Sequence, residues 1–334
     1  MKFTSYCDIE NSYRQKALDY IVQSGLSGGE WCVTEKIHGS NNSYMCNEEC
    51  VKQAKRGSVL GPDENFYGCL EVVKTEGPKV KALYDSLKKI KTFDILQVCG
   101  EIFGGWYPHP DVPKNTTATR VQKGIYYSPN NMFYPFDIML DGQYQNYDLC
   151  VKMFEEVGLF YAHILFRGTL QECLDYPNEF QTTIPDLLGL PKIEDNICEG
   201  VVIKPIEPTY LGCGSRVILK NKNEKWSEKV KKPKVKTKIT FTEEGQEVLD
   251  GINELLSENR LKNVLSKVGE INNKQFGMLL GMFIKDTFEE YSKENSEKYN
   301  ALGSHEQKRV NKMVGQLAGN IIRQQFQNIL DKTF

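Results

Sequence analysis

The chain has 334 residues, a length that predicts two domains or one large domain with an appendage. Hydrophobic residues make up 40% of the chain and charged residues 26%, which excludes a disordered or fibrous protein because a sizeable core can form. The formal net charge is -2, from 42 basic against 44 acidic side chains, so any basic surface for nucleic acid must be local.

The cysteines and the apolar runs bear on where the protein works. There are ten cysteines; Cys46 and Cys50 form the closest pair, and no second pair completes a zinc site or a disulfide framework. The first residues lack the apolar run of a signal peptide, and no stretch approaches the roughly 20 apolar residues that cross a bilayer. We therefore expect reduced thiols, no membrane association and an intracellular, cytoplasmic location, which is the host cytoplasm if the gene is viral.

Short apolar runs broken by Gly, Pro and Asn fill the chain from about residue 30 to residue 222. Because these runs are rich in β-branched and aromatic residues, they predict the strands of a largely antiparallel α+β domain. The clearest runs are residues 31–33, 95–98, 133–140, 201–203 and 217–219. Helical spacing of apolar residues predicts helices over 78–91 and 149–157.

The composition changes after residue 220. Nine lysines lie between residues 220 and 238, a run typical of a solvated linker and less often of a phosphate-contacting segment. After Thr240 the apolar period becomes 3.6, with stripes over 248–256 and 276–284, and a third helix opens at a capping box formed by Ser304 and Gln307. We predict a sheet domain over 1–238 and a small all-helical domain over 239–334.

The common phosphate and metal motifs are absent from the sequence, which contains no G-x-x-x-x-G-K-[ST] loop and no H-E-x-x-H pair. The candidate nucleophile is Lys36, which follows a strand and stands three residues before Gly39. A lysine attacks as a neutral amine, and desolvation and nearby cations lower a lysine pKa from about 10.4, so a stiff, partly buried strand end suits this chemistry. Taken alone, the spacing fits an exposed lysine before a turn equally well.

Four further motifs follow in chain order and favour a catalytic Lys36 over an exposed lysine before a turn. They are Glu101 at a strand end, Phe136-Asp137 in an aromatic strand, Glu199 with Lys204, and the Lys220/Lys222 pair on one strand face. In this order, after Glu35-Lys36-Ile37-His38-Gly39, the motifs resemble those of the covalent nucleotidyltransferases, the superfamily of ligases and capping enzymes.

The resemblance is closer to the phage-type double-stranded RNA ligase family, RNA ligase 2. It includes residues 9–13, Asn41, the Lys55-Arg56 pair and, by pattern, the helical tail. Pro135 departs from the family's pattern, and a proline suits a strand edge or a bulge.

The resemblance implies an ATP-dependent RNA ligase that works through three phosphoryl transfers. Lys36 attacks the α-phosphate of ATP to give lysyl-AMP, AMP then moves to the 5′-phosphate of the RNA, and a 3′-hydroxyl finally displaces AMP. The implied cofactors are ATP and Mg2+, with Mn2+ as a substitute metal. The implied partner is nicked double-stranded RNA, or an RNA-containing duplex, bound by a monomer.

The resemblance also implies which residues bind the nucleotide. Glu35 and Ile37 hold the adenine edge partly through backbone groups, and Phe136 stacks on the base. Asn41 and Arg56 bind the ribose and nearby phosphates.

The remaining motif residues are implied to act on hydroxyl, phosphate and metal. Glu101 takes a ribose hydroxyl, and Lys220 and Lys222 bind the α-phosphate. Glu199 is the implied Mg2+ ligand, directly or through water, with Asp137 as a second candidate. His38 orients pyrophosphate or packs, and Lys204 is an auxiliary residue.

Three alternatives remain at this point. A DNA ligase and an mRNA guanylyltransferase share the lysine chemistry, but their families follow the catalytic domain with a β-barrel, whereas residues 241–334 show helical stripes. The third alternative is an inactive nucleic-acid-binding relative, and the presence of every key polar residue argues against it.

Overall fold

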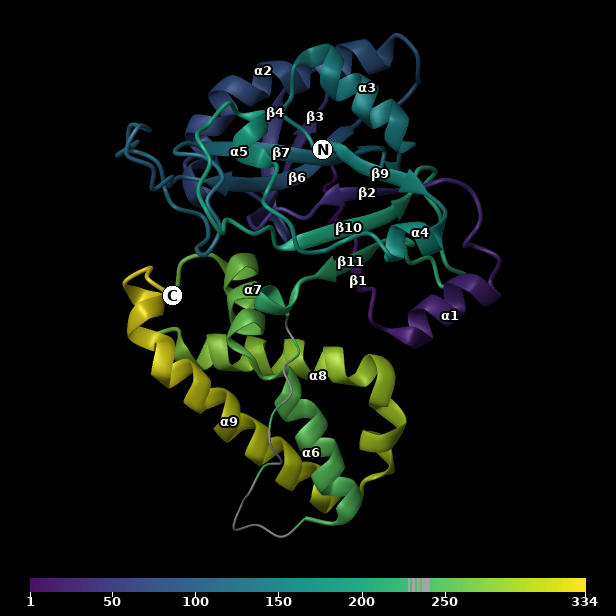
Figure 1. Cartoon of the computed structure of the whole chain (residues 1–334), viewed down its shortest axis with the longest axis vertical. Helices are drawn as coiled ribbons and strands as arrows, with labels where there is room; N and C mark the ends of the chain where they lie inside the picture. The colour runs from purple at the N-terminus through teal and green to yellow at the C-terminus, as the bar shows by residue number, and fades with distance from the viewer. Residues whose placement is uncertain (228, 230–231, 233–234, 236–240) are drawn as a thin grey trace. The chain divides into compact units, whose positions relative to one another are not determined.

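The computed structural model describes residues 1–227, 229, 232, 235 and 241–334. They form two compact units, Met1–Lys225 and Trp226–Phe334. All the strands of the described residues lie in the first unit, and helices α6 to α9 lie in the second (Figure 1). The predicted α+β class with a helical C-terminal part is confirmed. The predicted boundary between residues 238 and 239 lies outside the described residues and stays a prediction.

The larger sheet of the first unit has six antiparallel strands in the order β5-β4-β3-β6-β7-β8. Their bounds are β3 Ser40–Cys46, β4 Val51–Lys55, β5 Ser58–Val59, β6 Leu96–Gly104, β7 Asn131–Leu140 and β8 Gln143–Tyr144. Helices α2 (Cys69–Lys88) and α3 (Tyr147–Val157) pack on its outer face, where Leu83 and Phe154 meet Val98 and Ile138 in one apolar cluster.

The smaller sheet has five strands in the order β1-β11-β10-β2-β9. Their bounds are β1 Glu10–Asn11, β2 Trp31–Glu35, β9 Ile164–Gly168, β10 Gly200–Pro205 and β11 Leu219–Lys222. Only the β1–β11 pair is parallel. Helices α1 (Gln15–Gln23) and α4 (Leu170–Leu174) cover its outer face, where Ile21 and Leu170 pack on Val33 and Ile203; helix α5 (Ile184–Leu187) follows α4.

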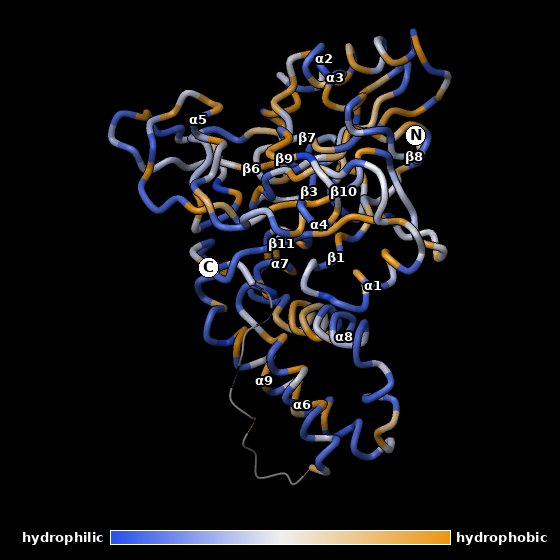
Figure 2. The backbone as a smooth tube through the Cα atoms, turned by 45° about the vertical axis from the view of Figure 1, so that its right-hand side comes forward, coloured by the Kyte–Doolittle hydropathy of each residue, from blue (hydrophilic) through white to orange (hydrophobic). Residues whose placement is uncertain are grey.

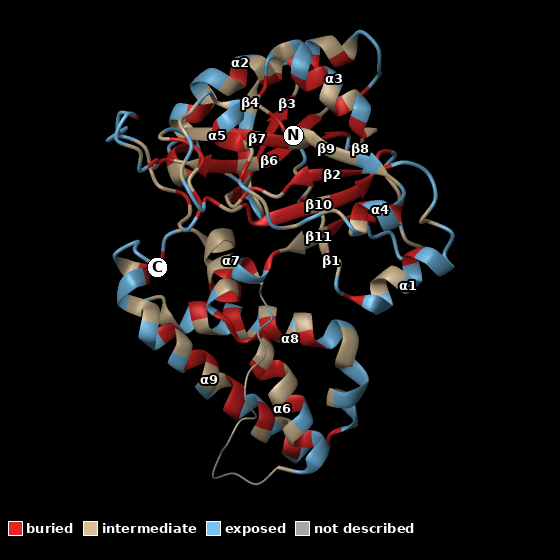
Figure 3. Ribbon diagram, viewed as in Figure 1, coloured by how far each residue is buried: buried red, intermediate tan, exposed pale blue. Residues whose placement is uncertain are grey.

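The inner faces of the two sheets meet along a thin apolar contact. Cys99 and Met139 of the six-stranded sheet cluster there with Tyr6 and Ile218, and Val202 packs against them. Strands β2, β6 and β10 are buried along most of their length (Figure 3). The predicted functional motifs therefore lie on strands whose positions the core fixes.

Strand β7 carries a bulge at the aromatic motif. Cys99 of β6 pairs with Asp137, and the next residue, Gly100, pairs with Pro135, so Phe136 is the extra residue without a partner on β6. A bulge bends the strand and redirects a side chain. The prediction that Pro135 suits an edge or a bulge is confirmed, because the short β8 pairs only with Met139 and Leu140 on the other side of β7.

Several element boundaries differ from the prediction. The helix predicted to begin at Pro78 begins at Cys69, because Cys69 and Val72 already contribute to the core. Pro78 lies inside this helix and removes one backbone hydrogen bond, whose acceptor would be the carbonyl of the exposed Lys74. The strand predicted over 217–219 begins only at Leu219, and helix α1 was not predicted.

The second unit is a helical bundle made of α6 (Glu243–Leu255), α7 (Glu258–Val268), α8 (Phe276–Ala301) and α9 (Ser304–Leu330). The predicted stripes are confirmed, since Leu249, Phe283 and Val314 share one core. Figure 2 shows hydrophobic residues alternating with hydrophilic ones along α6 and α9, as amphipathic helices require.

Two predictions for this unit were wrong or incomplete. Helix α7 was not predicted. The capping box is also wrong, because the N-cap of α9 is Gly303 without a side-chain cap, and the Gln307 amide donates to the Tyr299 carbonyl instead.

Candidate active site

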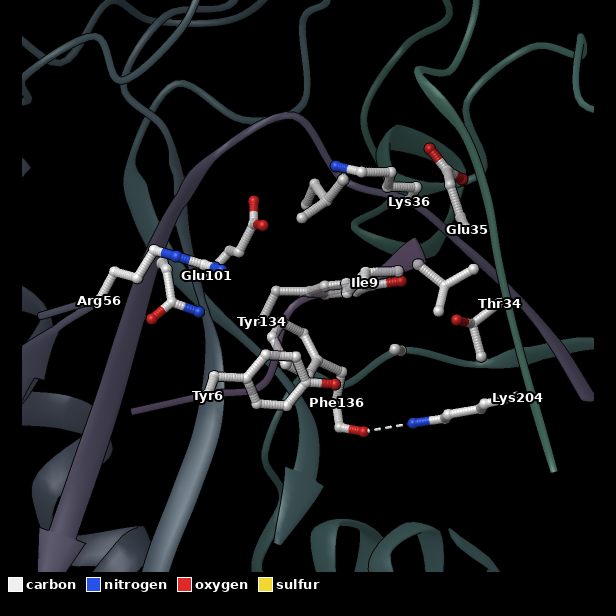
Figure 4. A pocket seen from close by; sticks show the side chains of 14 residues that line it. Tyr6, Ile9, Thr34, Glu35, Lys36, Arg56, Glu101, Tyr134, Phe136 and Lys204 are labelled. Carbon is white, nitrogen blue, oxygen red and sulfur yellow. Dashed lines mark hydrogen bonds between the residues drawn. The ribbon is translucent and has the colours of Figure 1, made fainter. Parts of the chain in front are cut away.

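A cavity opens between the inner faces of the two sheets of the first unit (Figure 4). Thr34 and Val202 line it from the five-stranded sheet, and Tyr134 lines it from the six-stranded sheet. Eight of the predicted site residues also line it: Glu35, Lys36, Ile37, Asn41, Arg56, Glu101, Phe136 and Lys204. Segments that lie far apart in the sequence therefore meet around this cavity.

Lys36 stands at the end of β2 with its amine in an ion pair. Its Nζ lies 2.9 Å from Oε2 of Glu199, and its backbone N–H donates to the Gly200 carbonyl at 2.9 Å. The side chain of Lys36 is 15% exposed, whereas that of Glu199 is 2% exposed. The amine is therefore held by a buried carboxylate, but the Lys36 side chain stays partly exposed at the cavity.

Glu199 is the centre of a charged cluster. Its other oxygen, Oε1, lies 2.9 Å from Nζ of Lys222, and Nδ1 of His38 lies 3.4 Å from Oε2. Burial by itself raises the pKa of a carboxyl, but Lys222 and Lys36 outweigh it, so the pKa of Glu199 lies well below its usual range. Burial lowers the pKa of His38, so its imidazole is neutral at neutral pH.

Gly200, directly after Glu199, shows why this strand end needs a glycine. Its φ is +142°, and a Cβ there would lie 2.1 Å from the Asn221 carbonyl oxygen. The close approach brings β10 against β11, where Gly200 pairs with Lys222. Lys220 lies on the same strand face as Lys222, opposite Val202, and neither lysine is among the residues that line the cavity.

Glu101 and its neighbours form the wall opposite Lys36. Asn41 of β3 pairs with Glu101 of β6, and the Glu101 carboxylate accepts the backbone N–H of Gly39 at 2.9 Å. Burial raises the pKa of Glu101 to about 7, and Glu199 adds to this shift while Lys36 opposes it. Arg56 reaches the same side of the cavity and pairs with Asp8.

The aromatic floor of the cavity is Phe136, the extra residue of the bulge. The Tyr6 ring packs edge-on against it, with a centroid separation of 5.0 Å and an interplanar angle of 65°. The Phe136 carbonyl accepts a hydrogen bond of 2.7 Å from Nζ of Lys204, drawn as the dashed line in Figure 4. The ring is thus fixed by a bulge, by a neighbouring ring and by a buried ammonium group.

Asp137 and Lys204 belong to a buried ionic cluster beneath this floor. Asp137 Oδ1 lies 2.9 Å from Lys204 Nζ, and its Oδ2 accepts from Arg216 at 2.8 Å and from the Tyr6 hydroxyl at 2.6 Å. Burial opposes ionisation of Asp137, but Arg216 and Lys204 overcome it and hold the pKa of this carboxyl well below its usual range. The expectation of Asp137 as a second metal ligand does not fit this structure, because both oxygens are fully buried and already occupied by cations.

Glu35 also lies differently from its expected role. Only 2% of the residue is exposed, and its side chain points away from the Lys36 amine (Figure 4) and bonds to Thr183. The carboxylate accepts from the Thr183 N–H at 2.8 Å and from the Thr183 hydroxyl at 2.7 Å. Only the backbone of Glu35 can face a nucleotide in the cavity.

Sequence reasoning missed several residues that build the site. Tyr6, Tyr127 and Arg216 contact motif residues but come from segments distant from them in the chain. A single sequence holds no spacing signal for such contacts, because the fold alone brings the segments together.

The comparisons with known proteins bear on both units. Residues 29–222 match the family model described as RNA ligase, and residues 238–330 match the one described as T4 RNA ligase 2 C-terminal. The mitochondrial RNA-editing ligase 2 of Trypanosoma brucei brucei is 30% identical over 349 residues, a match that covers 85% of this chain and 84% of that protein. RNA-editing ligase 1 of the same organism is 30% identical over 360 residues, covering 87% and 76%.

Solved structures of a Naegleria gruberi RNA ligase are also similar. The structure with pyrophosphate has a TM-score of 0.44 at 16% identity, and the match covers 68% of this chain and 58% of that one.

The architecture is that of a nucleotidyltransferase domain followed by a helical domain. The chain belongs to the RNA ligase family, with a C-terminal domain of the T4 RNA ligase 2 type, and it is an ATP-dependent RNA ligase. The predicted family and enzyme class are confirmed, and the DNA ligase and guanylyltransferase alternatives are set aside. Within the described residues, no helix is long and apolar enough to cross a membrane, and the cytoplasmic location stays a prediction.

Proposed function

We propose that this RNA ligase seals 3′-hydroxyl/5′-phosphate nicks in duplex RNA, or in an RNA-containing duplex, through a lysyl-AMP on Lys36 and an RNA-adenylate. The observation that carries the proposal is the position of the Lys36 amine at the edge of the inter-sheet cavity, held by Glu199 and faced by Glu101 and Phe136. The similarity to two proteins named as RNA-editing ligases supports RNA as the substrate.

The cavity offers complementary groups to each part of ATP. The Phe136 ring forms an apolar surface on which a purine can stack, and the backbone of Glu35 and Ile37 borders the same space. The amide of Asn41 and the carboxylate of Glu101 can bond ribose hydroxyls, and the Arg56 guanidinium can bond a phosphate.

The basic residues near Lys36 suit the phosphates. Lys222 lies on the far side of Glu199 from Lys36, and Lys220 shares its strand face, so both ammonium groups can approach an α-phosphate. His38, whose Nδ1 lies 3.4 Å from Glu199, is our candidate for orienting the leaving pyrophosphate.

The residues present fit a divalent metal bound together with the nucleotide. Among the described residues there is no cluster of three or more His, Cys, Asp or Glu side chains able to hold an ion by itself. Mg2+ commonly takes one or two protein carboxylates and completes its shell with substrate phosphates and water, and Glu199 can supply that carboxylate. Mg2+, or Mn2+ in its place, would neutralise phosphate charge there.

The chemistry of the first step belongs to Lys36. The ammonium loses a proton, the N–P bond to the α-phosphate forms, and the P–O bond to pyrophosphate breaks. AMP then passes to the RNA 5′-phosphate, which gains a good leaving group, and the 3′-hydroxyl attacks that phosphate and releases AMP. In each step the protein supplies position and positive charge.

The test of the nucleophile is the Lys36→Ala variant. With radiolabelled ATP and a divalent metal, the unmodified protein should form a covalent AMP adduct, and the variant should form none. The exposed Lys52, on strand β4 of the same unit, gives the matched control, since Lys52→Ala should label normally. An adduct found by mass spectrometry on a lysine other than Lys36 would contradict the assignment.

A panel of nicked duplexes tests the substrate. RNA and DNA are varied independently on the 3′-hydroxyl side, the 5′-phosphate side and the uninterrupted strand. We expect the fastest sealing with RNA at the 3′-hydroxyl side of a duplex nick. Faster joining of single-stranded RNA ends than of nicked duplex would contradict the proposal.

A further inference from the structure

Three side chains form hydrogen bonds with the backbone of the turn between Lys36 and strand β3. The His38 N–H donates to the Tyr127 hydroxyl at 2.9 Å, and the Gly39 N–H donates to Glu101 at 2.9 Å. The Gln122 amide donates to the Gly39 carbonyl at 3.3 Å. Residues 36–38 belong to no helix or strand, so contacts of this kind set where the turn lies.

Space around the turn is tight. A Cβ on Gly39 would lie 2.5 Å from the Ile102 carbonyl oxygen and 2.9 Å from a Glu101 carboxylate oxygen. A residue with a side chain therefore does not fit at this position, because the turn packs closely against β6. Tyr127 bonds the residue just before this glycine.

The ring of Tyr127 and the backbone next to it are both fixed by packing and hydrogen bonds. Its side chain is buried, with 3% of the residue exposed, and its ring packs edge-on against Phe103 at a centroid separation of 5.7 Å. The preceding residue, Tyr126, is fixed by Asn196, which accepts the Tyr126 N–H at 2.9 Å and donates to the Tyr126 carbonyl at 2.6 Å. The hydroxyl is thus presented to His38 by a buried ring whose backbone is fixed next to it.

A continuous chain of contacts runs from this hydroxyl to the nucleophile. Tyr127 bonds the backbone of His38, the His38 imidazole lies 3.4 Å from Glu199, and Glu199 lies 2.9 Å from the Lys36 amine. We propose that Tyr127 is a positioning residue for lysyl-AMP formation, because its hydroxyl holds His38 where the imidazole and Glu199 orient the amine of Lys36. This inference rests on the proposed function of Lys36.

A positioning role and a purely structural role predict different kinetics. A displaced His38 imidazole lowers the rate of the chemical step and leaves ATP binding nearly unchanged, because neither Tyr127 nor His38 lines the cavity. A purely structural role predicts a loss of thermal stability with rate and affinity unaffected in the folded fraction.

The first experiment is single-turnover adenylylation of the full-length Tyr127→Phe variant over a range of ATP concentrations. Loss of one hydrogen bond should lower the maximal rate about tenfold. The half-saturating ATP concentration should stay within about twofold, and the melting temperature should fall by no more than about 4 °C. The matched control is Tyr126→Phe, the neighbouring tyrosine, whose rate should equal that of the unmodified protein.

The second experiment tests whether the effect passes through His38. In the His38→Ala background, Tyr127→Phe should slow adenylylation by less than about twofold, because the group that it positions is gone. Should His38→Ala label too slowly to measure, His38→Asn replaces it. An equal loss in both backgrounds, or an unchanged rate in Tyr127→Phe, would overturn the inference.

The two proposals can fail separately. If the unmodified protein forms no AMP adduct on Lys36, the proposed function fails. If it forms the adduct and Tyr127→Phe forms it equally fast, only the positioning role of Tyr127 fails.

Discussion

At the scale of single residues, the site depends on one buried carboxylate. Glu199 forms ion pairs with both Lys36 and Lys222, with 2% of its own side chain exposed. When a nucleotide brings its phosphates and a divalent cation, the same carboxylate can exchange an ammonium partner for the metal. The resting ion pair and the proposed metal role are therefore two uses of one group.

Replacing Glu199 with Gln should separate these uses. We expect adenylylation to fall at least about 100-fold and the Mg2+ concentration for half-maximal rate to rise, because the amide carries no charge for the metal. Lys36 and Lys222 are 15% and 13% exposed and can turn toward water, so the loss of stability should stay at about 1–3 kcal/mol. A loss of activity matched by an equal fall in the folded fraction would make Glu199 a structural residue only.

Glu101 gives a pH-dependent prediction at the same scale. The pKa of about 7 in the folded protein exceeds that of an unfolded glutamate, so folding favours the protonated form. The stability that Glu101 contributes is therefore fully present below about pH 4.5 and is lost as the pH rises to about 7.

The variant Glu101→Gln keeps an acceptor for Gly39 and removes the titration. Relative to the unmodified protein it should gain about 2 kcal/mol of unfolding free energy between pH 5 and pH 8. Urea unfolding at the two pH values measures this difference. A constant difference would show that Glu101 ionises normally in the folded, nucleotide-free protein.

At the scale of elements, a buried ionic cluster joins the two sheets. Asp137 comes from β7, Lys204 from β10 and Arg216 from the segment before β11. The cluster contains one negative and two positive charges, and Nζ of Lys204 also lies 3.5 Å from the centre of the Tyr147 ring. Because Lys204 also bonds the Phe136 carbonyl, the cluster fixes the bulge that presents the ring to the cavity.

Because the cluster contains one negative and two positive charges, we expect two substitutions in it to lower the free energy of unfolding by different amounts. Lys204→Met leaves the Asp137–Arg216 pair, whereas Asp137→Leu leaves two unpaired buried cations. We expect Asp137→Leu to cost about 3–5 kcal/mol and Lys204→Met to cost at least about 1–2 kcal/mol less. Denaturant unfolding of both variants measures the difference, and equal costs would show that the pairs contribute little.

The elements also show what a single sequence could predict. Strands β2, β6, β7 and β10 were predicted because each is an apolar run next to a motif, and Lys36, Glu101 and Phe136 do meet around one cavity. Helix α1 is not predicted, and α2 begins at Cys69 rather than at the predicted Pro78, because the prediction rests on the apolar spacing after residue 78. The locations of Asp137 and Glu35 could not be predicted, since a motif does not say which face of a strand is buried against cations or threonines.

At the scale of the whole molecule, the chain consists of two units. All the residues around the cavity lie within Met1–Lys225, and the second unit has its own apolar core. Two basic residues of the second unit, Arg260 and Lys267, form ion pairs within the unit itself. Arg260 is buried and pairs with Asp286 at 2.9 Å, and Lys267 bonds the same carboxylate. Arg260 is therefore inaccessible to RNA, whereas the Lys267 side chain is 33% exposed.

A protein truncated after Lys238 tests this division. We expect it to form the AMP adduct and to join pre-adenylylated RNA ends, because these reactions need the cavity and a short stretch of RNA. It should fail mainly at the ordinary 5′-phosphate nick, whose recognition needs a broader footprint of phosphates than one cavity provides. Each phosphate contact releases counterions, so the affinity of the full-length protein for a nicked duplex should fall more steeply with salt than that of the truncated protein. Equal loss of ATP labelling and nick sealing on truncation would show instead that the helical unit serves only to stabilise the catalytic one, and parallel salt slopes would show that it binds no RNA phosphates.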